Sequence, residues 1–133
     1  MKKNIDTTRF GNIEAEIINF EDGILGFEEE KEWTIVDPCD STYILWLQSV
    51  NKPNLALPII ESNIFNKEKE VGEYFVLSIP QQIVEMSYNE KAPVLIKEGK
   101  GQQKILQNSE LSVNKNCYYS LKKIIINNSY DKN

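Results

Sequence analysis

The chain contains no histidine, the side chain that most often moves protons near neutral pH. Ser-His and Cys-His nucleophile pairs and histidine metal ligands are therefore excluded. The two cysteines, Cys39 and Cys117, are far apart and outside any Cys-x-x-Cys spacing, so they do not indicate a metal site. No phosphate-binding glycine loop, dinucleotide fingerprint, nucleophile elbow or zinc-protease motif occurs. We expect no enzyme, no cofactor and no metal site, and a hydrolase built on two converging carboxylates is the enzymatic alternative.

Acidic and apolar residues share one short stretch, FEDGILGFEEEKEW at residues 20–33, which we call the acidic loop. Its two glycines, Gly23 and Gly26, favour a backbone with positive φ or a close crossing of two segments. This backbone would let the apolar side chains of the loop turn into the core while its carboxylates stay in water. The apolar side chains concerned are Ile24, Leu25 and Phe27. One helical turn is expected at residues 28–32.

Partner contact is the alternative interpretation of the acidic loop. Phe27 is favoured as a core residue over an exposed anchor, because aromatic side chains are usually buried. For the glutamates of residues 28–32, a solvated face and a partner-binding face are about equally favoured. Gln48 and Ser49 are favoured as buried hydrogen-bonding residues over binding residues. The candidate partner-binding residues are Phe27, Glu28, Glu29, Glu30, Gln48 and Ser49. Gly23, Gly26, Asn89 and Pro93 are expected to act structurally, the last two through turn conformations.

Charge is unevenly distributed along the chain, whose net charge is −5. Residues 1–40 carry 4 basic and 11 acidic side chains, a net charge of −7, whereas residues 91–133 carry 8 and 3, a net charge of +5. An acidic surface attracts a basic partner by long-range steering, or only keeps the protein soluble. Direct nucleic-acid binding is disfavoured, because Arg9 is the only arginine and phosphate recognition relies on arginine. The alternative is a nucleic-acid-binding β-barrel that uses the basic C-terminal segment, with Tyr118 and Tyr119 as stacking platforms.

Apolar residues recur mostly with a period of two, which predicts strands. Turn residues separate these segments roughly every 8 to 12 residues, as is typical of a β-sandwich or barrel. Residues 42–50 are almost continuously apolar, as in a strand covered on both faces, and Pro58 indicates an edge position or a bulge. A hairpin turn is expected at 98–102, and residues 116–126 favour a strand over a helix by a small margin. We predict an all-β fold, a small antiparallel β-barrel or barrel-like sandwich with minimal helix.

The length of 133 residues is that of one ordinary domain. We expect a single β domain over residues 1–126 and a frayed tail at 127–133. The longest apolar run, residues 55–60, is far shorter than the ~20 residues of a membrane helix, and the N-terminus lacks the apolar segment of a signal peptide. A cytoplasmic protein with two free thiols, with no membrane and no small-molecule substrate among its partners, is expected.

Several motifs resemble the flagellar assembly factor FliW family. GILGFEE at residues 23–29 is similar to the family's Gly-Leu-Pro-Gly-Phe-Glu run, although Leu25 stands where the family commonly has proline. WLQSV and the NLALPII that follows it are similar to the next family strands. MSYNEKAPVLI, KILQNSELSV and the opening Arg9-Phe10-Gly11 continue the resemblance, which keeps the same order over residues 9–113. The region after Ile60 is shorter than the family pattern.

What the resemblance implies is a compact β-barrel that binds proteins and does not catalyse a reaction. FliW proteins are understood to bind the basic translational repressor CsrA, which relieves repression of flagellin messenger RNA, and to bind flagellin itself. The two partners then compete, so that free flagellin returns CsrA to its RNA target. The acidic half of this chain fits a basic partner.

Overall fold

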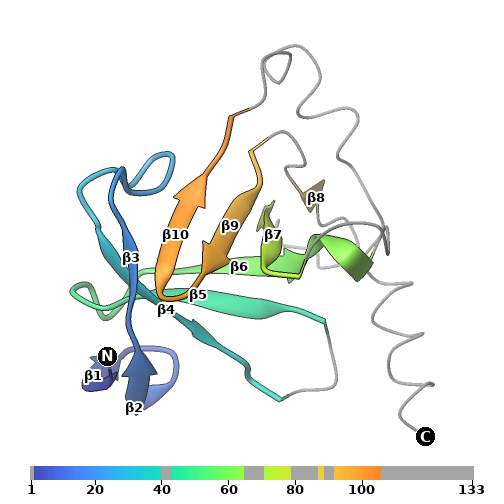
Figure 1. The fold of residues 1–133 in the computed structure, drawn as a ribbon. Coiled ribbons are helices and arrows are strands. Elements are labelled where there is room, and N and C mark those ends of the chain that lie inside the picture. The colour runs from blue at the N-terminus through green and yellow to red at the C-terminus, as the bar shows by residue number, and fades with distance from the viewer. Residues whose placement is uncertain (1, 40–42, 65–70, 79–86, 89–91, 106–133) are drawn as a thin grey trace, which may run out of the picture.

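Seven strands form a closed barrel in which each strand is hydrogen-bonded to the next around the ring (Figure 1). The protein is described by a computed structural model that covers residues 2–39, 43–64, 71–78, 87–88 and 92–105. In ring order the strands are β6 (Ala56–Glu61), β5 (Leu45–Ser49), β4 (Glu32–Val36), β3 (Ile18–Phe20), β10 (Lys100–Gln103), β9 (Val94–Lys97) and β7 (Glu73–Ser78), which returns to β6. The predicted small β-barrel is confirmed.

Two further pairings are attached to the ring. A short strand β8 (Ser87–Tyr88) pairs with β7, and a separate hairpin of β1 (Lys2–Thr7) and β2 (Gly11–Glu16) lies beside the barrel, at the lower left in Figure 1. Neighbouring strands of the ring run antiparallel except β3 and β10, which run parallel. The expected antiparallel barrel is therefore corrected at this one seam.

Apolar side chains from most of the ring fill the interior. Phe20 and Trp33 are fully buried there, together with Ile18, Ile24, Leu47, Ile59 and Val94. At the parallel seam Gly101 is paired with Phe20, and a Cβ atom on Gly101 would overlap the Phe20 ring. Glycine is needed at this position because the aromatic ring takes the space of a side chain.

The turn between β9 and β10 has the conformation that its sequence predicts. Glu98 and Gly99 connect the paired residues Lys97 and Lys100, and their φ angles are 53° and 78°. Two consecutive positive φ angles in a two-residue loop define a type I′ turn, which favours glycine. The hairpin expected at 98–102 is confirmed.

Strand β5 is covered on both faces where the sequence predicts it. Leu47 packs in the barrel interior, while Gln48 points to the opposite face, and both are fully buried. Pro58 faces Trp46 of β5, and the register between β6 and β7 begins only at Ile59. Pro58 thus lies in the part of β6 that β7 leaves unpaired, as an edge position requires.

The helical turn expected in the acidic loop is not formed, so this local prediction is wrong. Residues 28–32 form turns and the start of β4, and the helix in the described part of the chain is a 3-10 turn, η1 (Ser62–Ile64). Ile17 and Ile18 are both buried, because the chain passes there from the β1–β2 hairpin into the barrel. The expectations for residues 116–126 and 127–133 lie outside the described residues.

Candidate functional site

Three consecutive tight turns shape the acidic loop. Backbone hydrogen bonds of 2.6–3.0 Å close the turns at residues 20–23, 24–27 and 27–30. Gly26 has a φ of 88° at the third position of the middle turn, where type II turns require a positive φ. Gly23 has a φ of 69°, and a Cβ atom there would overlap the backbone of Glu28. Both glycines therefore have the positive φ angles that the sequence favours.

The middle turn separates the three apolar side chains of the loop. Ile24 is buried in the barrel, and Phe27 is half-buried in a T-shaped contact with the Trp33 ring, at a centroid distance of 6.3 Å. Leu25 is 54% exposed at the corner of the turn. The expectation that Leu25 turns into the core is wrong, because the second position of a tight turn points away from the chain that the turn connects. The favoured core position of Phe27 is supported, since its ring packs against the core cluster.

A side-chain contact across the barrel end holds the corner in place. The backbone N–H of Leu25 donates to Oε1 of Gln103 at 2.7 Å, and Nε2 of Gln103 donates to the carbonyl oxygen of Ala92 at 3.0 Å. One amide side chain thus fastens the acidic loop to the segments before β9 and at the end of β10. Nothing in the sequence pattern pointed to Gln103.

Glu30 is buried, in contrast to the other candidate glutamates. Its carboxylate accepts a hydrogen bond from the Ser49 hydroxyl at 3.2 Å and pairs with Nζ of Lys52 at 3.1 Å. The carbonyl oxygen of Glu30 accepts from the indole N–H of Trp33 at 2.9 Å. Glu28 and Glu29 are exposed. The solvated-face interpretation therefore fits Glu28 and Glu29 and is wrong for Glu30.

Gln48 is buried beneath the turn that connects β5 and β6. Its side-chain nitrogen lies 3.0–3.3 Å from four backbone carbonyl oxygens, which belong to Ser49, Lys52, Pro53 and Leu55. The oxygen Oε1 of Gln48 is buried and has no hydrogen-bond partner among the described residues. The prediction that Gln48 and Ser49 are buried hydrogen-bonding residues is confirmed, and both residues stabilise this turn.

The surroundings of Glu28 favour its ionised form and lower its pKa. The backbone N–H of Gly26 donates to Oε2 of Glu28 at 3.0 Å. This hydrogen bond, followed by the backbone N–H of Glu28 itself and the charge of Lys31, lowers the pKa of Glu28 below its ordinary value. Glu28 is therefore ionised at neutral pH, where a basic partner is also charged.

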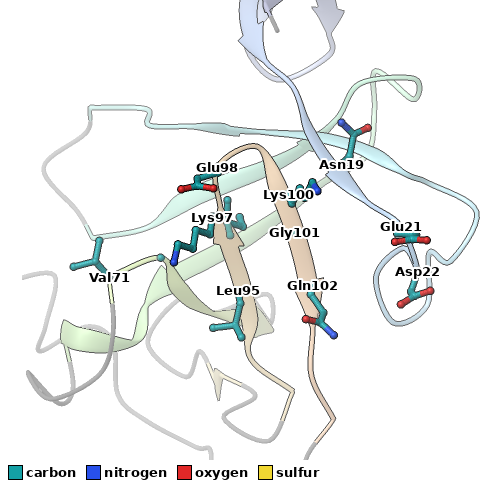
Figure 2. A pocket seen from close by; sticks show the side chains of 12 residues that line it. Asn19, Glu21, Asp22, Val71, Leu95, Lys97, Glu98, Lys100, Gly101 and Gln102 are labelled. Carbon is teal, nitrogen blue, oxygen red and sulfur yellow. The ribbon is translucent and has the colours of Figure 1, made fainter.

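A groove of about 900 Å³ lies on the outer face of β3, β10 and β9 (Figure 2). Glu21 and Asp22 of the acidic loop stand on one side of it, Val71 on the other, and Lys97 and Lys100 at the hairpin end. None of the candidate partner-binding residues lines this groove. Its mixed charges favour neither a basic nor an acidic ligand.

Other candidates are separated from the loop or lie outside the described residues. Pro93 is buried just before β9, and its carbonyl oxygen accepts from the backbone N–H of Lys104 at 2.9 Å. Cys39 is an exposed free thiol. Asn89, Cys117, Tyr118 and Tyr119 are outside the described residues. In the part of the chain that the structure describes, no helix is long and apolar enough to cross a membrane, and no three His, Cys, Asp or Glu side chains cluster as metal ligands would.

Comparison with known proteins agrees with this fold and loop. The family model of the FliW protein matches residues 3–71, which include the acidic loop and the turn after β5. A flagellar assembly factor FliW of Lachnospira eligens is 34% identical, in an alignment that covers 90% of this chain and 97% of the relative. A flagellar assembly factor FliW of Bdellovibrio bacteriovorus is 26% identical, covering 93% and 84% of the two chains. A crystal structure of the flagellar assembly factor FliW matches with a TM-score of 0.72 and 27% identity, over 90% of this chain and 96% of that one. The chain therefore belongs to the FliW family of flagellar assembly factors.

Proposed function

We propose that this flagellar assembly factor binds the basic RNA-binding regulator CsrA through the acidic loop, and that it also binds flagellin. Binding of CsrA would relieve repression of flagellin translation in the cytoplasm, and flagellin would compete for the same protein. No cofactor or small-molecule substrate takes part in this function. The observation that carries the proposal is the construction of the acidic loop, in which a rigid turn presents an apolar corner surrounded by carboxylates.

The loop has the composition of a small protein interface. Leu25 forms its apolar corner, and the exposed carboxylates around it are those of Glu21, Asp22, Glu28 and Glu29. Interfaces commonly combine an apolar centre with a polar rim, and rim charges mainly set the rate of association and the choice of partner. A carboxylate rim selects a partner with a basic surface.

The rigidity of the loop supports a binding role. Its turns, the Leu25–Gln103 hydrogen bond and the buried Glu30 hold the backbone in one conformation. A preorganised loop loses little conformational entropy on binding, which leaves more of the contact energy for affinity. We therefore propose Leu25, Glu28 and Glu29 as contact residues, with Glu30, Gln48 and Ser49 as their support and Phe27 as the connection to the core.

The central test measures association of this protein with purified CsrA at several salt concentrations. The double variant Glu28→Lys, Glu29→Lys should associate about tenfold more slowly at low salt, with a difference that shrinks as salt is added. The double variant Glu14→Lys, Glu98→Lys, the same change of charge at two exposed positions outside the acidic loop, is the matched control and should bind as the wild type does. Urea denaturation checks that all variants remain folded, with only the small loss expected in the loop variant from the missing Gly26–Glu28 hydrogen bond.

Two outcomes would contradict the proposal at different levels. Unchanged binding of the Glu28, Glu29 double variant would show that these acidic-loop carboxylates do not contribute to the interface, while CsrA would remain a partner. If the wild type does not bind CsrA at low salt, CsrA is not a partner of this protein. Flagellin is tested in the same assay, because its addition to the preformed complex should release CsrA if the two partners compete.

A further inference from the structure

A second surface cluster is basic and aromatic, whereas the acidic loop carries carboxylates. It consists of Arg9, Phe10 and Trp46, and we call it the Arg9–Trp46 platform. The guanidinium carbon of Arg9 lies 4.0 Å from the centroid of the Trp46 ring, and the Phe10 ring meets Trp46 edge-on at 6.4 Å. Arg9 is exposed, and both aromatic rings are half-buried. Arg9 and Phe10 come from the tip of the β1–β2 hairpin and Trp46 from β5, so the platform exists only in the folded protein.

The hairpin tip is fixed by its own hydrogen bonds. The Thr7 hydroxyl accepts from the backbone N–H of Phe10 at 2.8 Å and donates to the carbonyl oxygen of Gly11 at 2.9 Å. The backbone N–H of Thr8 donates to the carbonyl oxygen of Pro53 at 2.9 Å, which fastens the tip to the turn after β5. Arg9 and Phe10 are therefore held over β5 by the backbone and do not depend on their own contacts alone.

Within the described part of the chain, the hydrogen-bonding edge of Arg9 is free. Stacking on Trp46 uses the flat face of the guanidinium group, whereas its five N–H donors point outward in the plane of the group. Among the described residues no carboxylate forms an ion pair with Arg9, although the chain is rich in acids. A planar donor edge fixed beside two aromatic rings matches a carboxylate, which accepts two parallel hydrogen bonds.

We propose that the Arg9–Trp46 platform is a second protein-binding surface, specific for a segment that places a carboxylate beside an apolar side chain. The carboxylate would pair with the edge of Arg9, and the apolar side chain would cover the exposed parts of Phe10 and Trp46. Arginine and tryptophan are the residues that most often dominate binding energy at interfaces. Nucleic-acid phosphates are the less favoured occupant, because the net charge of −5 repels a polyanion.

The platform and the acidic loop thus select partners of opposite charge. The turn after β5 joins the two surfaces, since Lys52 pairs with Glu30 of the loop and Pro53 accepts from Thr8 at the platform. A basic partner on the loop and a carboxylate-bearing partner on the platform would occupy different surfaces. The platform proposal does not rest on the identity of CsrA or flagellin as partners.

The test uses the two tryptophan indoles as internal probes in ¹⁵N-labelled protein. Trp46 reports on the platform, while Trp33 is fully buried with its N–H bonded to Glu30 and serves as the control signal. The protein is titrated with the capped peptide acetyl-Leu-Glu-Leu-amide, and separately with acetyl-Leu-Gln-Leu-amide, up to ~10 mM. We expect the acidic peptide to shift the Trp46 signal saturably and to bind about tenfold more tightly than its amide counterpart, with Trp33 unmoved.

Variants locate the interaction at Arg9. Arg9→Gln should abolish the preference for the acidic peptide, and Arg9→Lys should weaken it because a lysine keeps the charge without the planar fork. Lys3→Gln, which removes an exposed positive charge from the same hairpin, is the matched control and should bind as the wild type does. Circular dichroism checks that each variant is folded.

Three results would overturn the proposal. The first is the absence of any Trp46 shift with the acidic peptide, and the second is equal binding of the two peptides. The third is a Trp46 shift that an oligouridylate produces at lower concentration than the acidic peptide, which would assign the platform to phosphate. A failure of the CsrA assay alone would leave these readouts intact, so the two proposals are tested separately.

Discussion

The hydroxyl of Ser49 donates a hydrogen bond of 3.2 Å to the carboxylate of Glu30, which is 19 residues away in the sequence. The same hydroxyl accepts from the backbone N–H of Lys52 at 3.1 Å, and Nζ of Lys52 pairs with the other carboxylate oxygen at 3.1 Å. Glu30 is only 8% exposed, so these groups replace much of its hydration. One buried carboxylate therefore connects the acidic loop to the turn after β5.

Replacement of Glu30 should destabilise the protein. Glu30→Ala removes the acceptor of the Ser49 hydroxyl and the partner of Lys52, and we expect it to lower the free energy of unfolding by about 1–3 kcal/mol. Glu29→Ala, the same change at the exposed neighbour, should alter it by less than about 0.5 kcal/mol. Urea denaturation of both variants measures the difference, and equal small losses would contradict the structural role of Glu30.

Gln48 offers a test with a defined pH dependence. Gln48→Leu removes an amide nitrogen that lies within hydrogen-bond distance of four carbonyl oxygens, and it should lower the free energy of unfolding by about 1–3 kcal/mol at every pH. Gln48→Glu would place a carboxylate against the same oxygens, which raises the pKa of the new side chain in the folded state.

The sign of the effect follows from that raised pKa. Below the pKa of an unfolded glutamate, about 4.3, the new side chain is protonated in both states and its ionisation costs no stability. As the pH rises above this value the unfolded state loses its proton first, so the folded state becomes relatively less stable. The deficit of Gln48→Glu against wild type should grow between about pH 4 and pH 7 in urea denaturation, while that of Gln48→Leu stays constant. If the loss of unfolding free energy stays constant with pH for both variants, the new carboxylate does not lie against the carbonyl oxygens.

Features that depend on neighbouring residues were predictable from the sequence. The turn at Glu98-Gly99 and the positive φ angles of Gly23 and Gly26 follow from glycine placement alone. The parallel pairing of β3 with β10 does not, because it joins segments about 80 residues apart and exists only once the ring closes. The need for glycine at position 101, where the Phe20 ring fills the space of a side chain, also arises only when the ring closes, so no local pattern marks it.

Prediction of the candidate site from the sequence is limited in the same way, because its contacts join distant segments. Composition places leucines inside and glutamates outside, but Leu25 is at the corner of a turn, and Glu30 lies beside two polar groups that only the fold brings near. The Arg9–Trp46 platform was also invisible, since its residues belong to a hairpin tip and a distant strand. Sequence reasoning located the loop and missed the contacts that orient it.

The carboxylate of Glu28 should titrate at a lower pH in the folded protein than in the unfolded chain. Its hydrogen bond from the Gly26 backbone favours the ionised form and holds the pKa of Glu28 below its ordinary value. The resulting contribution to stability is present above the pKa of an unfolded glutamate and is lost as the pH falls through the lower folded value. NMR titration of the Glu28 side-chain carboxyl carbon, with and without urea, compares the two midpoints. Coinciding midpoints would mean that the hydrogen bond does not persist in solution.

At Leu25, the stabilisation by one hydrogen bond to Gln103 can be compared with the stabilisation that proline gives by restricting the unfolded backbone. Leu25 occupies the second position of its turn, where proline is favoured, but its N–H donates to Gln103 at 2.7 Å and proline has no N–H. Leu25→Pro loses that bond, which stabilises by about 0.5–1.5 kcal/mol, and gains about 0.4–1 kcal/mol because proline restricts the unfolded chain. In the wild type the two effects should nearly cancel, with a net change below about 1 kcal/mol.

Removal of the acceptor separates these two effects. In a Gln103→Ala background the bond is already absent, so Leu25→Pro should stabilise the protein by about 0.4–1 kcal/mol. The difference between the two backgrounds, measured by urea denaturation as a double-mutant cycle, gives the coupling free energy of Leu25 with Gln103. Equal effects of Leu25→Pro in both backgrounds would show that the bond adds no net stability. The acidic loop would then be held by its own turns and by Glu30.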